Sequence, residues 1–403
     1  MPTPGAANEP IFARDDYDEI NERYFADILK DRSWRVLPAG WHNPHSEAGE
    51  GVQLRPIAPS DAIQYCLDEG AALGELKTSI LHLLSRWENK SISWDEATLC
   101  PSVSTANLAV LITLKAKGIR TIIFECPAYY ATLDQASILD FRILRVAGQL
   151  DTDFNIPIEK FIAKLPPEPC AVWMTQPRFG LGTDQNLGCL RNLGTALRRD
   201  DIIIFDEAAE QAFPSTLSRL GPLNCEVIRT RGLVKGIGLN GLRAAAILHT
   251  PKWRRPFEHA LEPSGASLDR FSLHNVAELG GQTPLMAGLL KTASEQVIRL
   301  RKKAEVASIG TWLTPTPLTN GYISTFFLNF SGLPGNYWEK RHALLSYCQE
   351  QRVPIVLRAS IGFPFDENWE AVRINYFTSE ENVETSAEIL VDAFPILADR
   401  LAR

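Results

Sequence analysis

Residues 234–243 read VKGIGLNGLR, and this stretch decides how the rest of the chain is interpreted. Lys235 precedes three glycines, and Arg243 follows the lysine by eight positions. Glycines permit close approach of the backbone to a ligand, and a guanidinium offers the bidentate geometry that a phosphate prefers. The spacing predicts that an amine and a guanidinium surround one phosphorylated aldehyde.

Pyridoxal phosphate is the obvious candidate for that aldehyde, although the stretch has two alternative interpretations. An isolated lysine near a strand end is usually a solvated surface charge. The same glycines also match the dinucleotide-binding pattern Gly-x-Gly-x-x-Gly. That pattern requires a helix that opens at its last glycine, whereas residues 242–249 read as a strand that ends before Pro251. It is therefore weak evidence for a dinucleotide.

The composition is typical of a two-domain globular protein. The chain has 403 residues, of which 45% are hydrophobic and 22% are charged, enough for one large core and a smaller one. The net charge is −7 and the basic residues form no long run, which argues against a nucleic-acid partner. The seven cysteines are scattered and form no Cys-x-x-Cys pair, as expected of reduced thiols in the cytoplasm.

Neither a secretory signal nor a membrane span is expected. Residues 1–10 have no basic start and no apolar core. No apolar run approaches the ~20 residues that a membrane helix needs. We therefore expect a cytoplasmic protein without a membrane partner. The seven histidines form no His-x-x-x-His pair, so no metal site is expected.

Short apolar runs alternate with helix-length segments between residues 95 and 250. An amphipathic helix at 74–87 precedes them. The runs lie at 121–125, 142–146, 171–175, 202–206, 227–230 and 244–249. Runs that are nearly all apolar indicate strands buried on both faces. The pattern predicts an α/β fold in which helices sandwich a mostly parallel sheet.

A different pattern follows a long helical region at 281–308. The predicted elements after it are a strand, a helix and two further strands, at 322–330, 336–351, 354–359 and 371–377. This order suits a separate, smaller α+β domain that closes the chain.

The chain is thus divided into three parts. We predict an N-terminal arm at 1–60 with a helix at 15–32, a large ligand-binding domain at 61–290 and a small C-terminal domain at 291–403.

Several polar or aromatic groups lie at strand or helix ends, where open parallel sheets bind their ligands. Asp206 ends a buried run, and a buried carboxylate keeps a pyridine nitrogen protonated, although capping of a following helix is the simpler interpretation. Ser104 and Thr105 open a helical run, where hydroxyls and free amides bind a phosphate or merely cap the helix. Tyr129 follows the strand at 121–125, where an aromatic either stacks on a flat ring or packs in the core.

With these residues assembled, the chain resembles the class I and II aminotransferases, pyridoxal-phosphate enzymes of the aspartate aminotransferase fold. The resemblance extends from about residue 70 to the C-terminus, and residues 235–243 keep the family's lysine, glycines and arginine. It implies that Lys235 forms a Schiff base with the cofactor and transfers protons. It also implies that Arg243 holds the phosphate and that Asp206 contacts the ring nitrogen.

The same resemblance assigns the remaining contacts. Ser104 and Thr105 match the family's phosphate-binding turn, and Tyr129 matches its stacking aromatic. Arg373 corresponds to the arginine that grips the α-carboxylate of the amino-acid substrate. Enzymes of this kind are homodimers with shared active sites, so we expect a homodimer in which residues 261–275 of the partner contribute.

Two departures from the family concern the cofactor's phenolic oxygen. The family asparagine is replaced by Phe179, and the tyrosine expected three residues after the aspartate is replaced by Ala209. Loss of both donors destabilises the phenolate and should raise the pKa of the cofactor imine. Arg178 and Gln176 are the candidates to replace them.

A third departure concerns the phosphate. Gly232 and Val234 stand where the family has hydroxyl residues just before the lysine. Arg229 and Arg231 are the candidates to compensate there.

Three functions are compatible with these residues. The leading hypothesis is an aminotransferase, the commonest activity of the family. The altered contacts to the phenolic oxygen favour, as an alternative, elimination, replacement or cyclisation on the same cofactor. A ligand-binding protein without catalysis is the third hypothesis, against which the retained lysine argues, since binding alone does not require it.

Overall fold

The structure is a computed structural model that describes residues 52, 54, 56, 71–148, 156–264, 268–353, 355–358, 363 and 366–403. The predicted N-terminal arm, apart from three isolated positions, and the predicted helix at 15–32 lie outside the described residues.

The large sheet has seven strands in the order β1-β7-β6-β5-β4-β2-β3. They are β1 (Ala97–Cys100), β2 (Thr121–Cys126), β3 (Arg142–Ala147), β4 (Ala171–Thr175), β5 (Ile202–Glu207), β6 (Glu226–Gly232) and β7 (Ala245–Leu248). Strands β3, β2, β4, β5 and β6 run parallel, whereas β7 is antiparallel to β6 and β1 is antiparallel to β7. The predicted mostly parallel sheet is confirmed.

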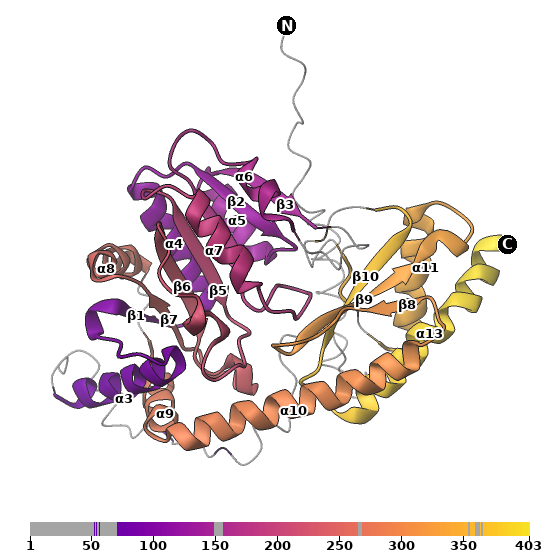
Figure 1. The fold of residues 1–403 in the computed structure, drawn as a ribbon. Helices are drawn as coiled ribbons and strands as arrows, with labels where there is room; N and C mark the ends of the chain where they lie inside the picture. Colours follow the sequence, from indigo (N-terminus) through magenta and orange to yellow (C-terminus); the bar gives the residue numbers. More distant parts are fainter. Residues whose placement is uncertain are drawn as a thin grey trace, which may run out of the picture.

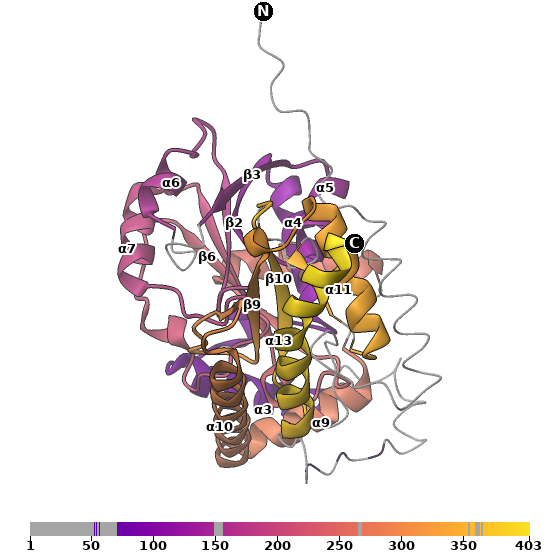
Figure 2. The same ribbon diagram turned by 90° about the vertical axis from the view of Figure 1, so that its right-hand side faces the viewer.

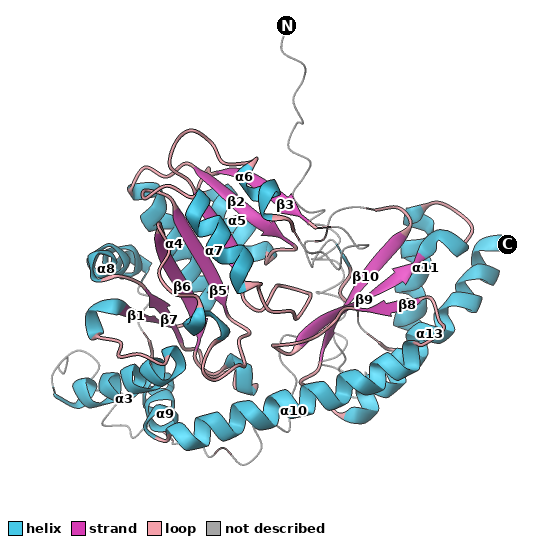
Figure 3. Cartoon of the chain, in the orientation of Figure 1, coloured by secondary structure: helices cyan, strands magenta, loops and turns pink. Residues whose placement is uncertain are grey.

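Helices cover both faces of this sheet (Figure 3). One face packs on α4 (Val103–Ala116), α5 (Tyr130–Ile138) and α8 (Arg254–Leu261). The other packs on α6 (Ile158–Ile162), α7 (Leu187–Ala196), α3 (Ala71–Glu88) and α9 (Arg270–Gly281). Every residue of β2, β4 and β5 is buried, because both faces are covered.

A second, antiparallel sheet has the order β10-β9-β8. Its strands are β8 (Leu313–Pro315), β9 (Ile323–Asn329) and β10 (Trp369–Asn375), and its core includes residues of α11 (Tyr337–Glu350) and α13 (Glu380–Ala402). Helix α10 (Thr283–Ser308) runs from the large sheet to the small one (Figure 1) and packs beside α13 (Figure 2).

The predicted domain boundary at residues 290 and 291 falls inside α10. Met286 and Leu290 pack with α3 and α9, whereas Ala293, Val297, Leu300 and Ala304 of α10 belong to the core of the small sheet. One helix therefore carries side chains of both cores.

Several elements differ from the sequence prediction. Of the predicted strand at 354–359, the described residues 355–358 form only an isolated bridge between Leu357 and Val372. Strand β1 and helix α13 were not predicted. None of the described helices combines the length and the hydrophobicity that a transmembrane helix requires.

Candidate active site

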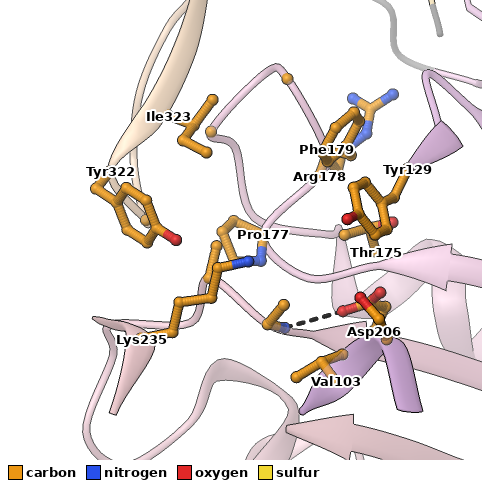
Figure 4. Close-up of a pocket in the computed structure, with 16 residues that line it drawn as sticks. Val103, Tyr129, Thr175, Pro177, Arg178, Phe179, Asp206, Lys235, Tyr322 and Ile323 are labelled. Carbon is orange, nitrogen blue, oxygen red and sulfur yellow. Dashed lines mark hydrogen bonds between the residues drawn. The ribbon is translucent and has the colours of Figure 1, made fainter. Parts of the chain in front are cut away.

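One pocket lies beyond the carboxyl ends of β4, β5 and β6 and is closed by the segment that leads into β9 (Figure 4). Its walls come from both sheets. The lining residues are Val103, Ser104, Tyr129, Thr175, Pro177, Arg178, Phe179, Gly180, Gly182, Asp206, Ala208, Ala209, Lys235, Gly321, Tyr322 and Ile323. Of the predicted site residues, Lys235, Asp206, Ser104, Tyr129 and Arg178 line it.

Lys235 begins a short 3-10 turn, Lys235–Ile237, three residues after β6 ends. Gly238 closes the turn with a φ of 78°, a conformation that favours glycine. A Cβ at Gly236 would lie 2.7 Å from the carbonyl oxygen of Glu210, so the turn packs directly on the chain that follows β5. The glycines of the VKGIGLNGLR stretch therefore fix the lysine at the pocket rather than open a dinucleotide-binding helix.

The amine of Lys235 is not an ordinary surface charge. Burial lowers its pKa to about 8, and the positive charges of Arg373 and Arg243 act in the same direction. The negative charge of Asp206 opposes them. A substantial fraction of the amine is therefore neutral near physiological pH.

Asp206 is 3% exposed and points from β5 into the pocket. Its Oδ2 accepts a hydrogen bond from Asn107 Nδ2 at 2.8 Å, and its Oδ1 accepts one from the backbone N–H of Ala208 at 3.0 Å. Asn107 Oδ1 in turn accepts from Thr230 Oγ1 at 2.8 Å. Burial raises the pKa of Asp206, because the two donors are neutral and only partly offset the loss of water.

The interpretation of Asp206 as a helix cap is wrong. Strand β5 continues to Glu207, and the chain then forms a turn. The carboxylate is held by a neighbouring helix, through Asn107, rather than serving as the cap of its own.

The predicted phosphate-binding turn is the N-terminus of α4. Ser102 caps this helix by accepting a hydrogen bond from Thr105 N at 3.0 Å, and its hydroxyl lies 2.9 Å from Thr105 Oγ1. Ser104 lines the pocket, whereas Thr105 does not. Arg243 is exposed and does not line the pocket, although its charge lowers the pKa of Lys235.

The aromatic and cationic side chains that follow β2 and β4 form another wall. The rings of Tyr129 and Phe179 are 5.7 Å apart at an angle of 56°. Arg178 Nε donates to Glu125 Oε1 at 3.0 Å, and Gln185 Nε2 donates to the other carboxylate oxygen of Glu125. The guanidinium of Arg178 thus has a buried counter-charge within the protein.

Arg373 lies on β10 and is 1% exposed. It is absent from the pocket lining, yet its charge lowers the pKa of both Lys235 and Tyr322. The small sheet thus brings a buried cation close to the pocket.

Tyr322 is a pocket residue that the sequence prediction missed. Its side chain is fully buried, and its ring stacks on Phe377 with centroids 4.2 Å apart and an angle of 19°. No motif marks it, since it is one aromatic residue at the start of a predicted strand. The contact of the segment before β9 with Pro177 and Ala209 is what makes Tyr322 part of the site.

The arginines suggested for the phosphate lie elsewhere. Side chains alternate across a strand, so Arg229 and Arg231 of β6 share a face with Glu207 and not with Thr230. Arg229 Nε donates to Glu207 Oε2 at 2.7 Å, and Arg231 Nη2 to Glu207 Oε1 at 2.5 Å. Both also pair with Glu88 of α3. These arginines belong to a buried ion network behind the sheet.

The chain is similar in sequence to one known family. The family model for aminotransferase class I and II matches residues 70–390. No curated protein sequence matches the chain.

Solved structures share the fold at low sequence identity. The aspartate aminotransferase of Thermus thermophilus with maleate is 15% identical, with a TM-score of 0.73 over 93% of this chain and 96% of that one. The aspartate aminotransferase of Rhizobium meliloti is 17% identical, with a TM-score of 0.72 over 98% of each chain. An Escherichia coli protein with a methionine aminotransferase function is 15% identical, with a TM-score of 0.73 over 93% of this chain and 97% of that one.

The match of the family model covers most of the chain and includes the lysine, the aspartate and both sheets that form the pocket. The chain belongs to the class I and II aminotransferases, a family of pyridoxal-phosphate-dependent enzymes.

Proposed function

We propose that the protein is an aminotransferase that acts on an amino acid and carries pyridoxal phosphate covalently on Lys235. One observation supports this above the others. The amine of Lys235 and the carboxylate of Asp206, from the ends of neighbouring strands, line the same pocket. Binding alone would not require an amine of lowered pKa there.

The residues present fit this cofactor. Asp206 is a buried carboxylate with a raised pKa and two neutral donors, so a protonated pyridine nitrogen would supply the charge that it lacks. The N-terminus of α4 at Ser104 and Thr105 would take the phosphate, with Arg243 at the exposed rim. Tyr129 would pack against the ring.

Arg373 would bind the substrate. This buried guanidinium on β10 suits the α-carboxylate, because a buried cation near a pocket favours an anionic partner. Arg178, also proposed as a cofactor contact, would act with Glu125 as one hydrogen-bonded unit.

Pyridoxal phosphate, when bound, supplies an electron sink for the bond that breaks at the substrate Cα. Lys235 Nζ would take the proton from the substrate Cα and deliver it to the aldehyde carbon of the cofactor. This role suits an amine with a pKa of about 8. Asp206 would keep the ring nitrogen protonated throughout. The apolar wall of Pro177, Phe179 and Ala209 would limit the access of water.

A second candidate uses the same cofactor for elimination, replacement or cyclisation at the β or γ carbon. The observation behind it is the apolar character of the side chains at Phe179 and Ala209, both of which line the pocket.

We also propose a homodimer in the cytoplasm. The segment 261–275 suggested for the partner is partly used within this chain, since Leu273 and Asn275 are buried in it.

The two candidates are separated by incubating the purified protein with a panel of amino acids, with and without 2-oxoglutarate. Transamination predicts product formation that needs the keto acid, and accumulation of the aminated cofactor without it. Product that forms without any keto acid, with no aminated cofactor, would exclude transamination and favour the second candidate.

A further inference from the structure

The hydroxyl of Tyr322 is a polar group that the proposed reaction does not yet use. Tyr322 is fully buried and lines the pocket, with its hydroxyl directed into the pocket space (Figure 4). Among the described residues, its Oη has no hydrogen-bond partner. A buried hydroxyl that lacks a partner is unfavourable and usually finds one in a ligand or water.

The position of Tyr322 is firmly set by contacts on both sides. Its ring stacks on Phe377, and its carbonyl oxygen accepts from Tyr376 N at 2.9 Å. On the other side, Asn320 Nδ2 donates to Asp184 Oδ1 at 2.8 Å. A Cβ at Gly321 would lie 2.7 Å from the Pro177 side chain, so the segment before β9 touches the large domain directly.

The chemistry of this wall favours an oxygen atom as the partner. Burial raises the pKa of Tyr322, so the phenol stays neutral and acts as a donor. Pro177 and Ala209, which lie against the preceding residue Gly321, have no polar side-chain atom. An oxygen of the bound molecule at this wall would therefore find its side-chain donor in Tyr322.

The connectivity of the cofactor identifies the oxygen, and this step rests on the proposed function. In pyridoxal phosphate the ring nitrogen is opposite the aldehyde, which is flanked by the phenolic oxygen on one side and the phosphate arm on the other. With the nitrogen at Asp206 and the aldehyde at Lys235, the phosphate arm would lie toward α4. The phenolic oxygen would then lie toward the wall that contains Tyr322.

We propose that Tyr322 Oη donates a hydrogen bond to the phenolic oxygen of the cofactor. The small domain would thereby supply a contact that the side chains of Phe179 and Ala209 do not. Since this donor would stabilise the phenolate anion, it would lower the pKa of the imine that joins the cofactor to Lys235.

The test is Tyr322→Phe, which keeps the ring and its stacking on Phe377. The visible absorbance of the substrate-free holoenzyme is titrated against pH. We expect the midpoint to rise by about one unit or more, since a hydrogen bond to a charged group is among the stronger ones. Tyr376→Phe is the matched control, because Tyr376 is fully buried in the same domain but pairs with Ser324 at 3.0 Å. Its midpoint should remain that of the wild type.

A second measurement compares the affinity of the two apoproteins for pyridoxal phosphate and for its analogue that lacks the phenolic oxygen. Wild type should bind the cofactor more tightly than Tyr322→Phe, and the difference should vanish with the analogue. An unshifted midpoint together with weaker binding of a carboxylate inhibitor would overturn the inference and assign the hydroxyl to the substrate. Wild-type protein that never attaches the cofactor would overturn the proposed function as well.

Discussion

Asp206 and Glu207 are consecutive carboxylates at the end of β5, yet they occupy opposite environments. Asp206 faces the pocket, accepts from neutral donors and has a raised pKa. Glu207 faces α3, accepts from Arg229 and Arg231, and has its pKa lowered to about 2. Both side chains are almost fully buried.

The difference comes from the period of two along a strand. One face of β5 and β6 meets the N-terminal part of α4. There Asp206 accepts hydrogen bonds from two neutral donors, Asn107 of α4 and the backbone N–H of Ala208. The other face meets the end of α3, where Glu88 and Trp87 complete the ion network, with Arg231 lying 4.9 Å from the Trp87 ring centroid. The carboxylate of Asp206 has only neutral donors within the protein, so a cationic group of a ligand can pair with it. The carboxylate of Glu207 is already paired with the two arginines.

The largest expected effect is on the free energy of unfolding, when the ion network around Glu207 is broken. Glu207→Gln leaves two buried arginines short of a counter-charge, and removing one partner of a buried pair costs about 3–5 kcal/mol. Denaturant unfolding at pH 7 measures this free energy. Glu258→Gln, in an exposed pair with Arg254, should change it by less than about 1 kcal/mol.

The same variant carries a pH signature. A carboxylate of lowered pKa stabilises the fold above its unfolded value of 4.5, and this contribution is lost as the pH falls toward about 2. Wild type should therefore lose stability over that window more steeply than Glu207→Gln. Equal slopes for the two proteins would contradict the assignment.

Breaking the pocket side should affect catalysis and spare the fold. Asp206→Asn removes the charge that would hold the ring nitrogen protonated, and we expect turnover to fall on the order of 10²–10³-fold, as when an electrostatic contact is removed. Unfolding should be unchanged or shifted to higher denaturant, because a buried carboxylate of raised pKa opposes folding. Asp201→Asn, which precedes the same strand at its other end and pairs with Arg198, should keep its turnover per folded molecule. A stable Asp206→Asn enzyme with full activity would refute the role.

The smallest effect is a pH dependence of cofactor capture. Burial lowers the pKa of Lys235 to about 8, so the reactive neutral amine increases with pH up to that value and then levels off. The rate of covalent capture by apoprotein, divided by that of Nα-acetyl-lysine, should therefore fall between pH 8 and 10. A ratio that stays constant through this range would show an ordinary lysine.

Sequence patterns predict the part of the site that the large sheet provides better than the part that the segment before β9 provides. The ends of β5 and β6 are recognisable from apolar runs, which is why Asp206 and Lys235 are both expected beyond the carboxyl edge of the sheet. The alternation along β6 directs Thr230 toward Asp206 and turns Arg229 and Arg231 away from the pocket. Tyr322 was not foreseeable, because its place depends on the contact of Gly321, before β9, with Pro177, after β4, two residues that are far apart in the sequence.

Attachment of the cofactor to Lys235 is tested most directly by borohydride reduction of the reconstituted protein, followed by peptide mapping with mass spectrometry. We predict one adduct, on the peptide that contains Lys235, and no adduct in Lys235→Ala. Lys340→Ala is the matched control, since Lys340 is buried but donates to the Phe330 carbonyl oxygen at 2.9 Å, and it should keep the adduct. An adduct on another lysine, or one that persists in Lys235→Ala, would contradict the proposed role of Lys235.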